Sequence, residues 1–396
     1  MSNGRIVIYD DETRSGEQYL KTLKESKSII RHFKNIESVE SRKFLEELNL
    51  LKKRQLDLRN GKSWTVESSL FDEISVFIID YDLVKASDSS SFLTGETVSY
   101  YVRCFSKCRI IIGLNQFGTN NFDLSLKGNP ESYADFNIGS DQLDNPGLWG
   151  GMPDGFRPWC WPDILGYLSN LVTKTRDLEG NLDERIFDFF ELPEEVIGIL
   201  PRSVSEFIGA EPKKTTFREF LTQSGNGLAR KDAIDNMEEN IQALVVASRI
   251  SKWLEQLVLP GQNILIDAPH LVQRYPSLLD GDHSTTETWN KTTTFEKPDK
   301  MGMDHEKIEE YRFKKDHWLS RPAWFLNELI NCQDIKEVTD PWTREPTEFV
   351  FCEDSSSFHR KEECREFLAE LESPYIRRYV RIFNGVDYTP RVRFSM

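Results

Sequence analysis

The sequence predicts an α/β protein, with a doubly wound parallel sheet in its N-terminal part followed by a helical connector and an α+β domain. Over residues 1–115, apolar runs alternate with amphipathic helical segments, and these runs lack the polar alternation of half-exposed strands. The second half mixes helical and strand patterns. Because 396 residues suffice for two or three domains, we divide the chain into an α/β domain (1–175), a connector (176–231) and a C-terminal domain (232–396).

The N-terminal elements follow from β-branched apolar runs and from apolar residues at three- and four-residue steps. Strands are expected at residues 5–9, 28–33, 74–79 and 109–114, although a helix also fits 28–33. Helices are expected at residues 15–26, 39–58, 95–105 and 163–173. This alternation of strands and helices is the pattern of a doubly wound sheet.

Beyond the predicted sheet, the pattern is less regular. Residues 115–161 are rich in Asn, Gly, Pro and Trp, which predicts a packed, irregular loop. A long apolar stripe predicts a helix over 232–257. The C-terminal domain is expected to contain strands at 263–267, 348–352, 379–383 and 391–394 and helices at 318–329 and 360–371.

Composition excludes several classes of protein. The chain has 65 acidic and 50 basic side chains, a net charge of −15, which disfavours nucleic acid as a partner over the whole surface. No apolar run is long enough for a membrane helix, and the first residues, MSNGRIVIYDDE, lack the pattern of a secretory signal. Six cysteines without a CxxC pair indicate reduced thiols. We therefore expect a cytoplasmic protein without a membrane partner.

Acidic residues follow two of the predicted strands. Asp10 and Asp11 end the first strand, and Asp80 ends the third. The carboxyl ends of parallel strands meet at one edge of a sheet, where ligands bind. Carboxylates that converge there repel one another and favour a hard cation such as Mg²⁺. The alternative interpretation is that these acids cap the helices and loops that begin at this edge.

The N-terminal region resembles the receiver domain of bacterial response regulators, through the segments RIVIYDDE, FIIDYDL and TGETVSYYVRCF…RIIIGLN. The resemblance implies a flavodoxin-like sheet in a phosphoprotein of two-component signalling. It also implies that Asp10 and Asp11 hold Mg²⁺, that Asp80 is both a metal ligand and the phosphoacceptor, and that the backbone carbonyl of Asp82 is a further metal ligand.

Two features of receivers are absent from their expected places. Asn115 stands where receivers have a Ser or Thr after the fourth strand, and no Lys-Pro pair occurs near residues 134–139, where the fifth strand would end. Lys127 and Arg157 are the nearby cations that could substitute. These departures favour a degenerate receiver that binds Mg²⁺ and serves as a docking platform over a fully switchable one.

The second half has a weaker candidate site. Asp267 ends a predicted strand, and His270 follows three residues later, a spacing that could orient a general base or hold a metal. The alternative is that Asp267 caps the following helix and the histidine is structural.

The leading functional hypothesis is a signalling or adaptor protein whose C-terminal domain binds a protein partner. Divergent receivers fused to unfamiliar domains resemble those of bacterial anti-phage defence, which implies a histidine kinase or a defence-system ATPase as partner. The second hypothesis is a receiver-gated effector enzyme that hydrolyses a nucleotide or nucleic acid through Asp267 and His270. The acidic charge and the lack of a helix-turn-helix pattern disfavour a third, a DNA-binding response regulator.

Overall fold

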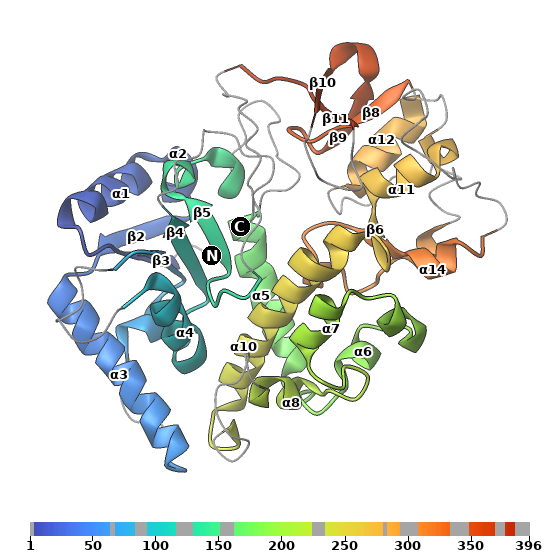
Figure 1. Cartoon of the computed structure of the whole chain (residues 1–396). Helices are drawn as coiled ribbons and strands as arrows, with labels where there is room; N and C mark the ends of the chain where they lie inside the picture. Colours follow the sequence, from blue (N-terminus) through green and yellow to red (C-terminus); the bar gives the residue numbers. More distant parts are fainter. Residues whose placement is uncertain are drawn as a thin grey trace. The chain divides into compact units, whose positions relative to one another are not determined.

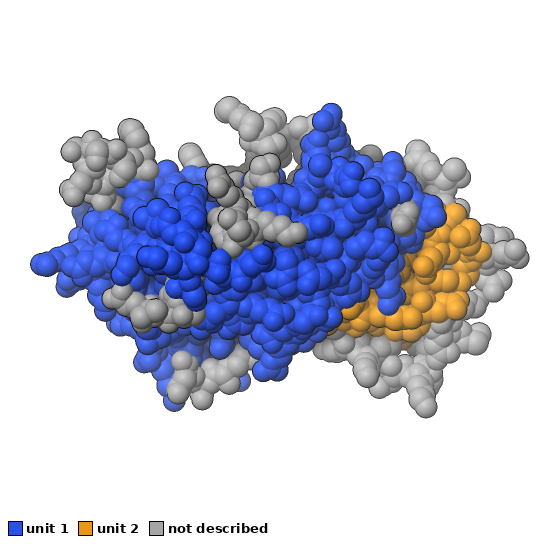
Figure 2. Space-filling view, turned by 90° about the horizontal axis from the view of Figure 1, so that it is seen from below, with its two compact units in different colours: residues 1–118, 127–151, 163–253 blue, residues 119–126, 152–162, 254–396 orange. Residues whose placement is uncertain are grey.

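The computed structural model divides into two compact units, which are coloured separately in Figure 2. Unit 1 contains residues 1–118, 127–151 and 163–253, and unit 2 contains residues 119–126, 152–162 and 254–396. The residues that the structure describes are 4–63, 68–83, 93–115, 130–150, 162–223, 234–279, 283–293, 308–332, 348–368 and 377–384. The predicted boundaries after residues 175 and 231 both fall inside unit 1, and the division into an N-terminal domain, a connector and a C-terminal domain stays a prediction.

The core of unit 1 is a five-stranded, fully parallel sheet with the order β2-β1-β3-β4-β5 (Figure 1). This order is that of a doubly wound, flavodoxin-like sheet, and its switch point lies between β1 and β3. The predicted parallel α/β sheet is therefore confirmed. The strands are β1 (Gly4–Tyr9), β2 (Phe33–Ser38), β3 (Val76–Asp80), β4 (Ile110–Asn115) and β5 (Phe136–Gly139).

Helices cover both faces of this sheet. Figure 1 shows α1 (Thr13–Glu25) on one side, and α3 (Ser41–Arg59) with α4 (Gly95–Phe105) on the other. The whole of β3 is buried, as its continuous apolar sequence predicts for a central strand. Helix α5 (Ile164–Leu178) follows β5 and likewise confirms the predicted helix there.

The second strand begins later than predicted. The sequence of residues 28–33 fits a strand or a helix, and the helical alternative is the one found, since Lys27–Ile30 is the short helix α2 and β2 starts at Phe33. Only Phe33 and Ile36 of β2 are buried, because β2 is the edge strand of the sheet. An edge strand needs few apolar residues, so β2 lacks the continuous apolar run that would predict a buried strand.

Helix α10 (Glu239–Lys252) is the central helix of the second part of unit 1. Every residue from 241 to 252 is buried, and the helix packs against α5 and α4. It begins later than the predicted helix of 232–257 and continues into a π-helical turn at Trp253–Val258. The remaining helices of this part are α6 (Ile186–Phe189), α7 (Arg202–Ile208) and α8 (Phe217–Thr222).

A buried polar network fixes α10 to the sheet. The carboxylate of Asp135, just before β5, pairs with the fully buried guanidinium of Arg103 on α4. It also accepts hydrogen bonds from the hydroxyls of Ser248 on α10 at 2.6 Å and Tyr167 on α5 at 3.0 Å. Each polar group thereby offsets the cost of burying the other, so the network fixes one arrangement of the helices.

Unit 2 is α+β. The strands β6 (Leu265–Asp267) and β7 (Ala323–Phe325) form an antiparallel pair, and a separate sheet has the order β10-β11-β8-β9. The strands of that sheet are β8 (Phe349–Cys352), β9 (Ser357–Arg360), β10 (Arg365–Leu368) and β11 (Arg377–Val380). The helices are α11 (Ala268–Arg274), α12 (His283–Thr292) and α14 (Leu326–Leu329).

Two predicted helices of this unit are wrong in part or in whole. Within 318–329 the α-helical part is α14, because Ala323–Phe325 pairs with β6 as β7, and Trp318 ends a preceding 3-10 turn. In the described part of the segment 360–371, residues 360–368, one helical turn, Lys361–Glu363, lies between β9 and β10. Tertiary pairing overrides local propensity in both segments. The strand predicted at 391–394 lies outside the described residues. No described helix has the length and apolar character needed to span a membrane.

Candidate metal centre

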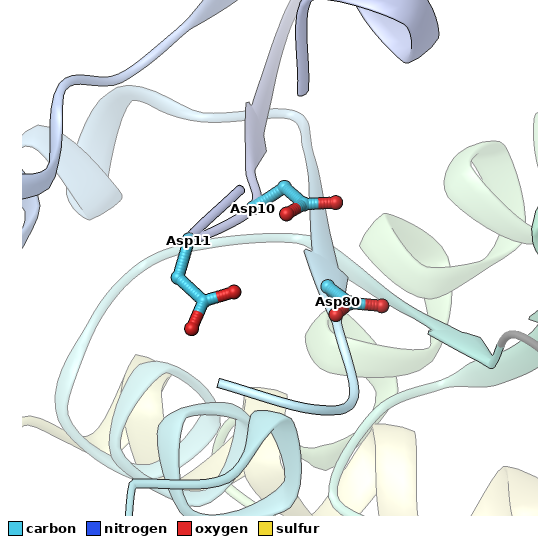
Figure 3. Close-up of side chains that lie close together, drawn as sticks. All are labelled: Asp10, Asp11 and Asp80. Atoms are coloured by element: carbon cyan, nitrogen blue, oxygen red, sulfur yellow. The ribbon is translucent and has the colours of Figure 1, made fainter. Parts of the chain in front are cut away.

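Three carboxylates meet at the carboxyl edge of the parallel sheet (Figure 3). Asp10 directly follows β1, Asp11 is the next residue, and Asp80 is the last residue of β3. Strands β1 and β3 are parallel neighbours, with Tyr9 paired to Ile79, so their ends lie side by side. One carboxylate oxygen from each aspartate lies within 4.8 Å of the other two. The fold thus brings together the three acidic side chains that the sequence singled out.

The carboxyl group of Asp80 is in an unfavourable environment for its own charge. The residue is 2% exposed, and its Oδ1 atom has no hydrogen-bond donor among the described residues. Burial, and then the negative charges of Asp10 and Asp11, raise its pKa from 3.8 to about 7, despite backbone hydrogen bonds from Tyr81 and Asp82. A buried acceptor without a donor, beside two further carboxylates, is an arrangement that a cation would stabilise.

Helix α4 holds the end of β3 in place. The backbone N–H of Gly95, the first residue of α4, donates to the carbonyl of Tyr81 at 2.9 Å. A Cβ atom at Gly95 would lie 2.4 Å from the carbonyl oxygen of Asp80, so the close approach requires glycine. The hydroxyl of Thr94 caps α4 by accepting from the N–H of Thr97.

Asp82 is placed differently from the other three aspartates. Its side chain is exposed and does not belong to the cluster of carboxylates, while its backbone forms a bridge with Thr94. The resemblance to receivers assigns a metal-ligating role to its backbone carbonyl alone. That assignment stays a prediction.

A hydrogen bond between two hydroxyl groups at the carboxyl edge of the sheet was not anticipated. Tyr19 on α1 is hydrogen-bonded to the side chain of Ser140, the residue after β5. Burial, and then the negative charges of Asp10 and Asp80, raise the pKa of Tyr19. Ser140 could have been found as a polar residue after a parallel strand. Tyr19 could not, because it fits the apolar stripe of α1.

In the part of the chain that the structure describes, the residues that end β4 and β5 differ from those expected of a receiver. Strand β4 ends at Asn115, and β5 ends at Gly139 with Ser140 next, so a neutral hydroxyl stands where receivers have a lysine. The two cations considered as substitutes, Lys127 and Arg157, lie outside the described residues.

The second candidate pair, in unit 2, is also brought together. The Nδ1 atom of His270 lies 2.6 Å from Oδ1 of Asp267, a fully buried residue that also caps α11. The carboxylate accepts further hydrogen bonds from Gln262 Nε2 at 2.9 Å and Arg321 Nε at 3.1 Å. Burial alone would raise the pKa of Asp267, but His270 and Arg321 outweigh it and lower the pKa to about 2.

This arrangement matches the capping interpretation of Asp267. Donors surround its carboxylate, and it is already the N-cap of a helix. Among the described residues, one group of acidic, histidine or cysteine side chains is arranged so that it could hold a metal ion. It consists of Asp10, Asp11 and Asp80, and does not include Asp267 or His270. The effector-enzyme hypothesis for Asp267 and His270 therefore stays a prediction without a metal site to support it.

The donors of the cluster fit a hard divalent cation. Carboxylate oxygens are the ligands preferred by Mg²⁺ and Ca²⁺, and the cluster contains no soft sulfur or imidazole ligand.

Comparison of the chain with models of protein families, with curated proteins and with solved structures found no match.

Proposed function

We propose that unit 1 is a receiver-like signalling module that binds Mg²⁺ through Asp10, Asp11 and Asp80. The observation that carries this proposal is the convergence of three carboxylates within 4.8 Å at the switch point of the sheet. The buried Oδ1 of Asp80, which has no donor among the described residues, supports it, since a bound cation would supply a partner. The strand order is consistent with a receiver-like module, and the acidic motifs after β1 and β3 are the residues that carry the resemblance.

We further propose that Asp80 is a weak phosphoacceptor. A carboxylate oxygen of Asp80 would attack the phosphorus of a small phosphodonor, forming an acyl phosphate as the bond between phosphorus and the leaving group breaks. A bound Mg²⁺ would neutralise charge on the incoming phosphoryl group. Because Ser140 offers no positive charge at the end of β5, we expect slow phosphorylation and a degenerate switch.

A chain of contacts that starts next to Asp80 supports a signalling role. The carbonyl of Tyr81, the residue after Asp80, accepts a hydrogen bond from the N–H of Gly95, the first residue of α4. Glu96, in the first turn of α4, accepts hydrogen bonds from the Ser132 hydroxyl and the Tyr133 N–H, both at 2.6 Å. The carbonyl of Ser132 in turn accepts from Arg249 at 2.7 Å and Lys252 at 2.8 Å, both on α10. A change at the carboxylates can therefore reach a buried helix through packed polar contacts within unit 1.

Titration calorimetry of the full chain with Mg²⁺ tests the metal site. We expect one bound ion in the wild-type protein, no binding in Asp80→Asn, and unchanged binding in the matched control Asp82→Asn, which keeps its backbone carbonyl. Equal binding by the wild type and Asp80→Asn would refute the proposed site.

Phosphorylation is tested separately, by intact mass after incubation with acetyl phosphate and Mg²⁺. The wild-type chain should slowly gain the mass of one phosphoryl group, and Asp80→Asn should not. A mass gain that persists in Asp80→Asn would place the phosphate elsewhere. If the wild-type chain binds Mg²⁺ but gains no mass, the proposed metal site stands and the proposal that Asp80 accepts a phosphoryl group is refuted.

A further inference from the structure

Two cysteines in the four-stranded sheet of unit 2 form a close pair of thiols. Cys352 is the last residue of β8 and is completely buried, and Cys364 is half-buried just before β10. Their sulfur atoms are 3.1 Å apart, and the Cys352 thiol donates to Cys364. This distance is about 1 Å longer than a disulfide bond, so a small movement of one side chain would join them.

Backbone pairing fixes both residues. Cys352 pairs with Ser357 on β9 and with Tyr379 on β11, so it lies in the interior of the sheet. The N–H of Cys364 donates to the carbonyl of Lys361 at 3.1 Å, and its sulfur lies 3.2 Å from the carbonyl of Arg360. The fold therefore holds two sulfur atoms together that are separated by 12 positions in the chain.

The two thiols differ in reactivity. The hydrogen bond from Cys352 and the positive charge of Arg381 lower the pKa of Cys364 in spite of its partial burial. The pKa of Cys352 is raised by the same hydrogen bond and by burial. Cys364 is thus the more accessible sulfur and the one that more readily becomes a thiolate, the nucleophilic form.

We propose that Cys352 and Cys364 are a redox-active dithiol, which a low-molecular-weight disulfide such as oxidised glutathione converts into a disulfide between β8 and the segment before β10. This modification site is independent of the metal site in unit 1. The sequence predicts that the cysteines are reduced thiols. Under oxidising conditions, we expect this pair to depart from that prediction by forming a disulfide.

The reaction takes place in two exchanges. The Cys364 thiolate attacks one sulfur of the oxidant, whose sulfur–sulfur bond breaks, and the released thiolate takes a proton from solvent. Cys352 then loses its proton to solvent and attacks the Cys364 sulfur, releasing the second thiol. Two protein thiols lose two electrons in total, and one oxidant disulfide becomes two thiols.

The remaining described cysteines serve as references. Cys104 and Cys108 are fully buried, and burial raises the pKa of both, to about 12 for Cys108. Cys332 is half-buried, as Cys364 is, and follows α14, where its N–H donates to the carbonyl of Leu329. Cys332→Ser is therefore the matched control for Cys364→Ser.

The test uses the full chain in buffers of reduced and oxidised glutathione, with acid quenching, alkylation and peptide mapping. We expect a Cys352–Cys364 crosslink that dithiothreitol reverses and that forms at least about tenfold faster in the folded chain than in urea. Cys352→Ser should accumulate one glutathione on Cys364, Cys364→Ser should form no crosslink, and Cys332→Ser should behave as the wild type.

The result that overturns the proposal does not depend on any variant. If wild-type chain in the same buffers keeps both thiols available for alkylation after denaturation, or carries glutathione on Cys364 without crosslinking, the pair is a structural packing contact. If the crosslink forms no faster in the folded chain than in urea, the fold does not promote the reaction, and the pair is again a structural packing contact.

Discussion

Two buried aspartates, one in each unit, both follow an apolar strand, but their pKa values shift in opposite directions. Asp80 follows the apolar run of β3, and Asp267 follows the apolar run of β6. The pKa of Asp80 is raised to about 7, whereas that of Asp267 is lowered to about 2. The neighbours cause the difference, because Asp80 faces two further carboxylates and Asp267 faces an arginine and a histidine.

The comparison separates a candidate ligand site from a structural one. Asp267 is already saturated, with donors from Gln262, His270 and Arg321. Asp80 has a buried oxygen without a donor among the described residues. A fold that keeps such a carboxylate loses stability unless something else binds there, so Asp80 indicates a ligand and Asp267 indicates a stabilising cap.

The largest expected effect comes from removing the saturated carboxylate. Asp267→Ala should lower the free energy of unfolding by about 3–5 kcal/mol, because it removes the buried carboxylate that Arg321 Nε, His270 and Gln262 share, and with it the cap of α11. Urea denaturation measures this loss. Glu309→Ala, which breaks the more exposed pair with Arg312, is the control and should cost less than about 1 kcal/mol.

The same variant has a pH signature. A carboxyl group with a lowered pKa stabilises the fold above its unfolded pKa and loses that contribution as the pH falls toward its folded pKa. The difference between wild type and Asp267→Ala should therefore shrink between about pH 4 and about pH 2. A difference that does not change with pH would show that packing, and not the charge of Asp267, carries the effect.

The next effect concerns how the fold positions Asp80. Gly95→Ala should lower the free energy of unfolding by about 1–3 kcal/mol, because the new Cβ would push against the backbone of Asp80 and Tyr81. Weaker Mg²⁺ binding should accompany the loss. The control is Gly198→Ala, whose Cβ would meet nothing within 4 Å, and it should stay within about 0.5 kcal/mol of wild type. Equal losses in both variants would contradict the close approach.

The smallest effect has the opposite sign. In the presence of a chelator, Asp80→Asn should raise the free energy of unfolding by about 1–2 kcal/mol above pH 7, because it removes one of three converging charges. A carboxyl group with a raised pKa costs stability as the pH rises from its unfolded pKa to its folded one, so the gain should grow between about pH 4 and about pH 7. Denaturation at several pH values measures it, and a loss of stability would show that Asp80 is structural.

Much of unit 1 could be predicted from the sequence. The strands at β1, β3 and β4 are continuous apolar runs because both of their faces are buried, and acids at their ends mark the carboxyl edge. The position of edge strand β2 was predicted wrongly, because most of its side chains are exposed and its sequence is therefore polar. In unit 2, β7 and β10 resembled helices because they are short and owe their conformation to partner strands.

The sequence by itself determined a parallel α/β sheet, an acidic edge and the three aspartates of the candidate metal centre, since strand alternation and strand ends are local patterns. The tertiary structure alone decided what each charge faces. Ser248 meets Asp135 across 113 positions, Arg321 reaches Asp267 across 54, and Cys364 folds back onto Cys352. The physical reason is that electrostatics and reactivity depend on distance in space, which a linear pattern does not contain.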